Sequence, residues 1–254
     1  MPSIETQLPT PGTNRHIAVI PCRWGASRFP GKPIADLAGK PLLWHVYQRC
    51  LQATTLTHTF VATDDRRIAA VCEAHGIPWI MTGRHPTGTD RVAECAERLD
   101  ADAYINVQGD EPFIDPAAID AVSTALASLP PGVLAVNACS QLSDPATVQD
   151  HNVVKVVTGN DHRALMFSRL PIPYPKGDRP TYLRQLGLYG FTPEGLRIFR
   201  TLRQGSLERA EGVEMLRFLE HSHPVQMVLT HDSGTAVDTP DDLERAEAQL
   251  LSQR

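Results

Sequence analysis

Three cations stand close together in the segment PCRWGASRFPGKP, residues 21–33: Arg23, Arg28 and Lys32. The segment follows the apolar run HIAVI and contains two glycines, which allow a ligand to approach the backbone closely. Ligands of open α/β sheets bind beyond the carboxyl ends of the strands. We therefore predict a phosphate-binding loop. The segment matches neither GxxxxGKS/T nor GxGxxG, and a solvated basic loop is the alternative.

Two aspartates follow other extended segments and suit a divalent cation. Asp110 stands in NVQGDEP after the apolar run AYINV, and Asp238 stands in GTAVDTPDDL. Mg²⁺ takes one or two carboxylates and completes its octahedron with water and phosphate oxygens. Opposite a phosphate-binding loop, the pair predicts a magnesium site. A turn or a helix cap is the simpler role for each aspartate taken alone.

The scaffold predicted for these residues is a mainly parallel, doubly wound α/β sheet. Nine short apolar runs predict strands: HIAVI, TFVAT, PWIM, AYINV, VLAVNA, VVKVV, ALMF, LGLYGF and VQMVL. Helical segments separate the early runs, and such alternation is typical of a parallel sheet. A later helix is expected over residues 206–222. A closing helix is expected after Thr239, as its N-cap, with Asp242 three residues on.

The regularity of this alternation divides the chain. Residues 1–14 are polar and rich in Pro and Thr, which predicts a flexible tail. Residues 15–139 alternate between strand and helix, and residues 140–205 are strand-rich with a Pro-rich loop, LPIPYPKGDRP. Residues 206–254 return to the α/β core.

Composition narrows the classes of partner and the compartment. The 254 residues are 42% hydrophobic, which is enough for one or two packed domains, and the net charge is -5. That charge does not attract nucleic acid or an anionic membrane, so a site for an anionic substrate must be locally basic. No apolar stretch approaches 18 residues, so no membrane span is expected. The five cysteines have no metal-binding spacing and predict reduced thiols in a cytoplasmic protein.

Seven ordered motifs across residues 17–245 resemble those of the CMP-KDO synthetases, where KDO is the acidic sugar 3-deoxy-manno-octulosonate. The motifs are IPCRWGASRFPGKP, HPTGTDRVAE, NVQGDEP, FSRLPIPY, RQLGLYGF, SLERAEGVEMLR and GTAVDTPDDLER. The resemblance implies a nucleotidyltransferase-type (Rossmann-like) nucleotide-binding core. It also implies a smaller strand-rich insert, residues 140–205, that forms the acceptor site and the interface of a homodimer. The implied reaction is the Mg²⁺-dependent transfer of CMP from CTP to a small acidic acceptor, with release of pyrophosphate.

The resemblance also assigns roles position by position. The triphosphate binders would be Arg23, Arg28 and Lys32, and the cytosine readers Arg91 and Gln108, with Thr87 and Gly88 beside them. The magnesium ligands would be Asp110 and Asp238, which form the catalytic set together with Arg23 and Lys32. Arg169 would bind the acceptor carboxylate, and the acceptor pocket would also contain Gln185, Tyr189, Glu211, Glu214 and Met215.

Two of these positions depart from the family motif. Gln185 stands where the family has His, and Met215 stands where it has Gln, although both positions face the sugar in the family. A thioether is a weak acceptor and no donor, so a sugar hydroxyl would lose a partner. The departures favour an acceptor with fewer hydroxyls. A small phosphonate such as phosphonoformate and a KDO-like sugar acid therefore stay equally open.

Two other functions stay open at this point. One is a non-catalytic nucleotide sensor that kept the fold, and the other is an enzyme that uses UTP or another nucleoside triphosphate. A sensor would be expected to lose its metal carboxylates, whereas Asp110 and Asp238 are both present. Lys155, in NVVKVV, also matches a family position, and a charge at a strand edge is the simpler interpretation.

Overall fold

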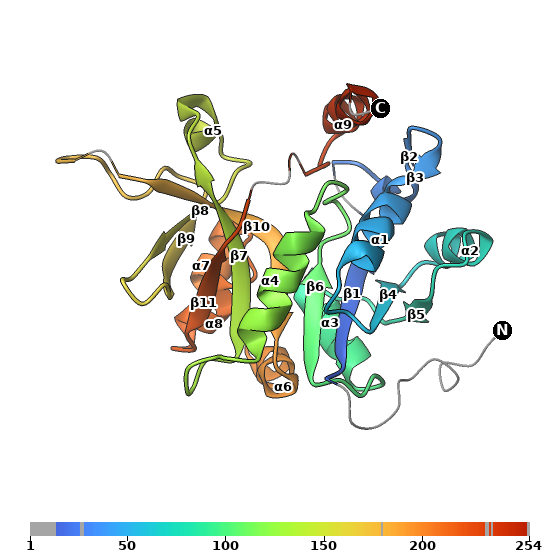
Figure 1. The fold of residues 1–254 in the computed structure, drawn as a ribbon, viewed down its shortest axis with the longest axis horizontal. Coiled ribbons are helices and arrows are strands. Elements are labelled where there is room, and N and C mark those ends of the chain that lie inside the picture. The colour runs from blue at the N-terminus through green and yellow to red at the C-terminus, as the bar shows by residue number, and fades with distance from the viewer. Residues whose placement is uncertain (1–13, 26–27, 179, 232–233, 235, 253–254) are drawn as a thin grey trace.

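The computed structural model describes residues 14–25, 28–178, 180–231, 234 and 236–252. This part of the chain forms a nine-stranded sheet of strand order β11-β7-β10-β6-β1-β4-β5, in which β8 pairs with β10 and with β9 (Figure 1). The strands are β1 (His16–Cys22), β4 (His58–Thr63), β5 (Trp79–Met81), β6 (Ala103–Val107), β7 (Ala135–Leu142), β8 (Lys155–Thr158), β9 (Ala164–Ser168), β10 (Tyr182–Phe191) and β11 (Val225–Leu229). A separate hairpin consists of β2 (Asp36–Leu37) and β3 (Lys40–Pro41).

The helices follow in the same order along the chain. They are the 3-10 turn η2 (Lys32–Ile34) and the helices α1 (Leu42–Gln52), α2 (Arg66–Ala74), α3 (Gly88–Ala96), α4 (Pro116–Leu126), α5 (Pro145–Gln149), α6 (Pro193–Thr201), α7 (Ser206–Glu211), α8 (Leu216–Glu220) and α9 (Pro240–Ser252). The sequence does not predict α5 and α6. Their signals are nevertheless present, because each begins with a capping residue, Asp144 or Thr192, followed by Pro at the first helical position.

The mainly parallel sheet expected from the sequence is confirmed. β1 pairs in parallel with β4 and β6, β4 with β5, and β7 with β11. Only β10 and the β8–β9 pair bring antiparallel neighbours into the described part of the sheet. All nine apolar runs overlap strands, because a strand covered by helices on both faces must be apolar at nearly every position.

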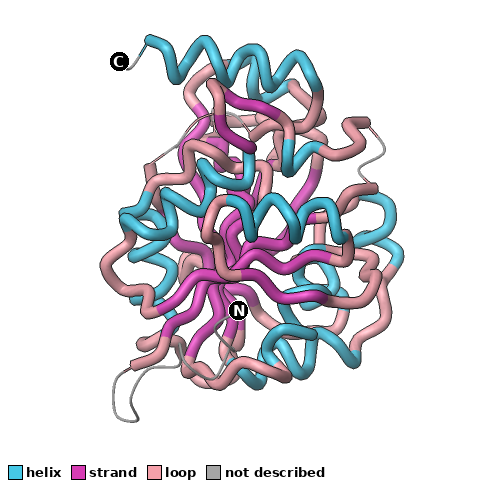
Figure 2. Tube along the Cα trace, turned by 90° about the vertical axis from the view of Figure 1, so that its right-hand side faces the viewer, coloured by secondary structure: helices cyan, strands magenta, loops and turns pink. Residues whose placement is uncertain are grey.

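Helices cover both faces of the sheet. Ile17 and Val19 of β1 pack into one apolar cluster with α3 and α6, whereas Ala18 and Ile20 pack into another with α1 and α4. Successive side chains of a strand point to opposite faces, so a run without polar residues supplies both clusters. In Figures 1 and 2 the strands lie in the middle of the molecule with helices around them.

One edge of the sheet gathers the residues expected to do chemistry. β1 and β6 are parallel neighbours, so the loop after Cys22 and the loop after Val107 leave the same edge. The segment between β11 and α9 returns to this edge, where the backbone N–H of Val237 donates to the carbonyl oxygen of Asp110 at 2.8 Å. The two predicted metal ligands are therefore neighbours through the main chain.

The expected helix over residues 206–222 is broken. α7 ends at Glu211, Gly212 adopts a left-handed conformation with φ of 63°, and α8 begins only at Leu216. A residue without Cβ takes this conformation at no steric cost, and it reverses the direction of the chain. The prediction of one helix was therefore wrong, and residues 212–215 connect two short helices instead.

Other expectations concern the surface and the termini. Of the flexible tail expected over residues 1–14, residues 1–13 lie outside the described residues. In the described ranges, no helix is both long and apolar enough to cross a bilayer. The five cysteines are all buried and unpaired, in agreement with the reduced thiols that the sequence predicts.

Candidate active site

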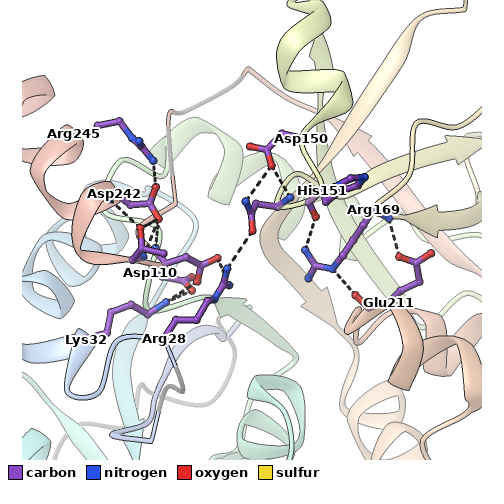
Figure 3. Close-up of polar contacts among 12 residues, drawn as sticks. Arg28, Lys32, Asp110, Asp150, His151, Arg169, Glu211, Asp242 and Arg245 are labelled. Carbon is purple, nitrogen blue, oxygen red and sulfur yellow. Dashed lines mark hydrogen bonds and ion pairs between the residues drawn. The ribbon is translucent and has the colours of Figure 1, made fainter.

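Lys32 joins the two predicted metal ligands. Its Nζ donates to Oδ2 of Asp110 at 2.8 Å and to Oδ1 of Asp238 at 3.1 Å (Figure 3). Burial is the largest single influence on the pKa of Lys32, and it lowers that pKa. The charges of Asp110 and Asp238 and the hydrogen bonds to them together outweigh burial, so the pKa of Lys32 is raised. One ammonium thus holds two carboxylates that lie far apart in the sequence.

The closing helix fixes the position of Asp238. Oδ2 of Asp242 accepts hydrogen bonds from the N–H groups of Asp238 (3.1 Å) and Thr239 (2.8 Å), and the Asp242 N–H donates to Oγ1 of Thr239 at 3.2 Å. This reciprocal arrangement is the capping box that the sequence predicts. It orders the chain immediately beside the Asp238 carboxylate.

Seven residues expected to bind nucleotide line one pocket, with a volume of about 510 Å³. They are Arg23, Arg28, Lys32, Thr87, Gly88, Arg91 and Gln108, and both Asp110 and Asp238 lie in the same wall. Arg28 is more exposed than Lys32, and its Nη2 donates to Oδ2 of Asp238 at 3.0 Å. The pocket therefore presents a basic wall against the acidic background of the chain.

Gly88 and Thr87 form the N-terminus of α3 inside this pocket. Thr87 caps the helix by accepting the Asp90 N–H at Oγ1, at 3.1 Å. A Cβ at Gly88 would lie 2.7 Å from Nε2 of Gln108, so a larger residue there would displace the end of the Gln108 side chain. Arg91 is nearly fully buried, and its guanidinium donates to Thr82, Gly83 and Asp64.

A second pocket of about 590 Å³ adjoins the first. It shares Arg28, Gln108, Asp110, Glu214 and Asp238 with the first pocket. The second pocket is also lined by three residues expected on the acceptor side, Arg169, Gln185 and Tyr189. The two predicted metal ligands therefore lie where the two pockets meet.

Two backbone carbonyl oxygens hold the guanidinium of Arg169 in place. Its Nε donates to the carbonyl oxygen of Glu211 at 2.7 Å, and its Nη1 donates to that of His151 at 2.9 Å (Figure 3). Gln185 donates from Nε2 to Oδ1 of Asn137 at 2.7 Å. Burial raises the pKa of the Tyr189 hydroxyl well above its ordinary value, and the Glu214 and Asp110 charges act in the same direction.

Two residues expected in the acceptor pocket line neither of these pockets. Met215 is completely buried in the apolar cluster with Phe199 and Phe218, because α8 turns away after the break at Gly212. Glu211 bonds inward instead, accepting from Oγ of Ser168 at 2.7 Å and from the N–H of Arg169 at 2.8 Å. Its carboxylate therefore supports Arg169 rather than facing the pocket.

Glu214 lines both pockets and also contacts α3. Its carboxylate accepts hydrogen bonds from the N–H groups of Gly88 (3.0 Å) and Thr89 (2.8 Å) at the start of α3. Burial raises the pKa of Glu214, whereas these two hydrogen bonds act in the opposite direction. The contact connects the segment after α7 with the nucleotide pocket.

Sequence reasoning missed a buried ion cluster that ties these same segments together. Arg217 is 2% exposed, and its guanidinium donates to both carboxylate oxygens of Asp90 (2.6 and 3.0 Å) and of Glu208 (2.7 and 2.8 Å). It also stacks over the ring of Phe199, 4.0 Å from the centroid. No local pattern announces such a cluster, because its members lie on α3, α7 and α8.

The cation loop after β1 is held by an aromatic contact. The Trp24 ring would lie 3.1 Å from a Cβ at Gly31, whose φ is 75°, and the guanidinium of Arg67 lies 3.3 Å from the ring centroid. Asp65 orients Arg67 through two hydrogen bonds, to Nε at 2.9 Å and to Nη2 at 2.7 Å. The ring is therefore held between a glycine and a cation.

The two carboxylates fit Mg²⁺ better than a metal that needs a complete protein cage. Among the described residues, no group of three or more His, Cys, Asp or Glu could hold a metal ion. Asp110 and Asp238 supply hard oxygen ligands at a point where both already contact one cation, the Lys32 ammonium. Mg²⁺ is bound by this number of carboxylates when substrate phosphates complete its coordination.

Comparisons with known proteins agree with this arrangement. A family model described as Cytidylyltransferase matches residues 17–226. A 3-deoxy-manno-octulosonate cytidylyltransferase of Anaeromyxobacter dehalogenans (strain 2CP-C) is 46% identical over 243 residues, which cover 94% of this chain and 99% of that protein. An 8-amino-3,8-dideoxy-manno-octulosonate cytidylyltransferase of Shewanella sp. (strain W3-18-1) is 39% identical and covers 93% of this chain and 98% of its own length.

A solved structure is similar over nearly the whole chain. It is a CMP:2-keto-3-deoxy-manno-octonic acid synthetase complexed with CTP, with a TM-score of 0.88 and 36% identity. The match covers 94% of this chain and all of the other one.

Replacing Arg217 with Met should lower the free energy of unfolding by about 3–5 kcal/mol, because it leaves two buried carboxylates without their partner. Urea unfolding measures the loss. Arg197→Met is the matched control, since Arg197 makes only an exposed ion pair with Glu194 and should change stability by less than about 1 kcal/mol. Equal effects of the two substitutions would contradict this role of Arg217.

The Asp65–Arg67 contact should contribute stability in a pH-dependent way. Hydrogen bonding to Arg67 lowers the pKa of Asp65 from 3.8 to about 2. The Asp65 carboxylate therefore contributes fully to the free energy of unfolding above about pH 4, and this contribution is lost as the pH falls toward 2. Urea unfolding should show a stability difference between wild type and Asp65→Asn that narrows as the pH is lowered.

The exposed carboxylate of Glu73 lies on the same helix and gives a charge-matched control. Glu73→Gln should change stability little across the same pH range. A difference for Asp65→Asn that stays constant as the medium becomes acidic would rule out this contribution.

Proposed function

This chain belongs to the cytidylyltransferase family, and on that premise we propose that it transfers CMP from CTP to a KDO-type sugar acid, with Mg²⁺ at Asp110 and Asp238. The transfer of a cytidylyl group from CTP is the activity of the family. The metal, the acceptor and the roles of the individual residues are our proposal.

One observation carries the proposal. Lys32 contacts both Asp110 and Asp238 at the point where the two pockets meet. A reaction between two anionic substrates needs positive charge where they meet, and carboxylates there serve no purpose unless they hold a cation. Arg28 lines both pockets, and Arg169 lines the second.

The reaction then follows from charge and position. An acceptor hydroxyl oxygen forms a bond to the α-phosphorus of CTP as the bond from that phosphorus to the pyrophosphate oxygen breaks, and the hydroxyl proton passes to solvent. Arg23, Arg28 and Lys32 bind the triphosphate and stabilise the charge that develops on the departing pyrophosphate. Bound Mg²⁺ supplies further neutralisation of the phosphate oxygens.

The chain's own ion pairs prepare the site for both ligands. Without them, two neighbouring carboxylates would repel each other, and Lys32 offsets that repulsion. Nucleotide phosphates offer Lys32 and Arg28 new partners, which releases Asp110 and Asp238. The residues are thus arranged for nucleotide and divalent cation to bind together.

On the acceptor side, the arrangement supports a sugar acid. Arg169 presents a guanidinium whose Nε and Nη1 are held by carbonyl oxygens, which orients the group toward a planar carboxylate. Of the two departures that favoured a small phosphonate, Met215 lies in the apolar core and lines neither pocket. Only Gln185 remains as an argument for the phosphonate, so we place KDO and 8-amino-KDO first.

Pyrophosphate release from CTP and Mg²⁺ tests the proposal, with KDO, 8-amino-KDO and phosphonoformate as separate acceptors. Turnover is expected with a KDO-type acid, and CTP should be preferred to UTP in competition. Asp110→Asn and Asp238→Asn should each lower the rate about a hundredfold or more, because each removes a proposed metal ligand. Asp241→Asn, an exposed position in the first turn of α9, is the control and should keep the rate.

Each failure has a separate meaning in this assay. Turnover of phosphonoformate alone would replace the sugar acid as acceptor. CTP binding without turnover of any acceptor, unchanged in both Asn variants, would indicate a nucleotide sensor. A preference for UTP over CTP would show that UTP is the nucleotide substrate.

We also propose that residues 140–205 form the acceptor side and the contact surface of a homodimer. β9 and the loop after it expose large apolar side chains: Leu165 (65%), Leu170 (60%) and Tyr174 (83%). A second copy of the chain would remove these side chains from water.

Light scattering should give twice the chain mass of 27.9 kDa. Leu165→Glu combined with Leu170→Glu should reduce the measured mass to one chain. Leu51→Glu, at a similarly exposed leucine on α1, is the control and should leave the mass unchanged. A wild-type protein of single-chain mass would contradict the dimer.

A further inference from the structure

Lys155 is a fully buried cation that neither the nucleotide nor the acceptor pocket uses. It is the first residue of β8, its exposure is 0%, and it lines neither of the two pockets. Burial lowers its pKa, since the charged form loses its hydration. A buried charge without water is costly, so its presence calls for contacts that an apolar side chain could not provide.

Those contacts are three backbone carbonyl oxygens. The Lys155 ammonium donates to the carbonyl oxygens of Asp150 at 2.8 Å, Val153 at 2.6 Å and Arg169 at 2.6 Å. An ammonium carries three N–H donors, and all three are used here. In the described part of the chain it makes no ion pair, so its role is to bind backbone rather than to neutralise a carboxylate.

Two of the three carbonyl groups belong to one loop, residues 150–153, which connects α5 to β8. Inside this loop the carbonyl oxygen of His151 accepts from Nη1 of Arg169 at 2.9 Å. The Asn152 side chain accepts from Nη1 of Arg28 at 3.1 Å. Figure 3 shows Asp150 and His151 between Arg28 on one side and Arg169 on the other.

We propose that Lys155 is a positioning residue: by fixing the loop 150–153 and the Arg169 backbone together, it sets Arg169 on the acceptor side and Arg28 on the nucleotide side in a constant relation. The inference rests on the proposed function, in which these two arginines bind the two substrates. Lys155 itself touches neither substrate. Its ammonium acts on the site indirectly, through the carbonyl oxygens of Asp150, Val153 and Arg169.

The geometry explains why lysine occupies this position. Three acceptors that come from different directions suit a compact ammonium on a flexible stem, whereas the planar fork of arginine directs its donors into one plane. A methionine would fill a similar volume but would remove the ammonium donor from all three carbonyl oxygens, and in the described part of the chain only the Asp150 oxygen would keep a backbone donor, the N–H of Val153 at 3.2 Å. The loop would then lose its anchor while the apolar packing of the stem is largely kept.

A second interaction also supports the loop, and it is made by the exposed side chain of Asp150. Oδ1 of the exposed Asp150 side chain accepts from the N–H of Asn152 at 2.8 Å and from its Nδ2 at 3.1 Å. Asp150 thus orients the side chain that contacts Arg28. Substitutions at Asp150 and Asn152 can test the loop without disturbing the core.

The experiment compares Lys155→Met with Lys40→Met, a control at an exposed lysine of β3 outside both pockets. The dissociation constant of CTP is measured by calorimetry. The KM and kcat for the acceptor are measured at saturating CTP, with whichever of KDO and 8-amino-KDO wild type turns over. Lys155→Met should raise the acceptor KM about tenfold or more, and should weaken CTP binding severalfold, because a displaced binding group loses its contacts.

Asn152→Ala separates the two arms of the loop. It removes the side-chain contacts of Asn152 to Arg28 and Asp150 but leaves the three carbonyl contacts of Lys155, so it should weaken CTP binding by about two- to fivefold and raise the acceptor KM less than Lys155→Met does. If Lys155→Met does not fold, Asp150→Ala takes its place and should raise both constants. Lys40→Met should leave both unchanged.

A folded Lys155→Met that loses thermal stability but keeps both constants would overturn the inference, since the residue would then be structural only. An Asn152→Ala variant with wild-type affinity for CTP would show that the contact between Asn152 and Arg28 does not position Arg28 for the nucleotide. Wild-type turnover tests the proposed function, whereas the ratios between variants test this inference. The CTP measurement decides the nucleotide arm even without an acceptor.

Discussion

The carboxylates of Asp110 and Asp238 lie close together, and like charges repel each other. The rest of the site depends on how this repulsion is offset. Lys32 lies between Asp110 and Asp238, and the Val237 N–H binds the Asp110 carbonyl oxygen. The first contact is electrostatic and exchangeable, whereas the second is a main-chain contact that persists when the cation changes. Together they keep the two aspartates adjacent, as the proposed metal site requires.

Positive charge is concentrated locally in a chain whose net charge is -5. Arg23 and Lys32 line the first pocket, Arg169 lines the second and Arg28 lines both, so each pocket has cations for the anionic substrate that we propose it binds. Behind the first pocket, Arg217 and its two carboxylates form a further group of charges that is buried. Because charges inside the protein interact more strongly than charges in water, these few residues can outweigh the acidic surface.

The antiparallel strand β10 gives the acceptor side its shape. Its pairing with β7 shifts register between Gln185 and Tyr189, and Asn137 fills the irregularity by donating from Nδ2 to the carbonyl oxygens of Leu186 and Leu188. A bulge bends the strand and re-aims its side chains. Gln185 and Tyr189, on either side of it, both line the second pocket. The loop that Lys155 holds closes the same pocket from the far side.

The sequence by itself determined the parts of this protein that depend on local pattern. The strands follow from apolar runs, the cap of α9 from Thr239 and Asp242, and the cation loop from its position after β1, because these signals act between near neighbours. Only the tertiary structure decided that Met215 packs in the core, that Glu211 supports Arg169 and that Arg217 joins three helices. It alone gave Lys155, otherwise interpreted as a strand-edge charge, its three carbonyl partners. These contacts arise where chain reversals, above all at Gly212, bring distant segments together, and no periodicity along the chain encodes such a meeting.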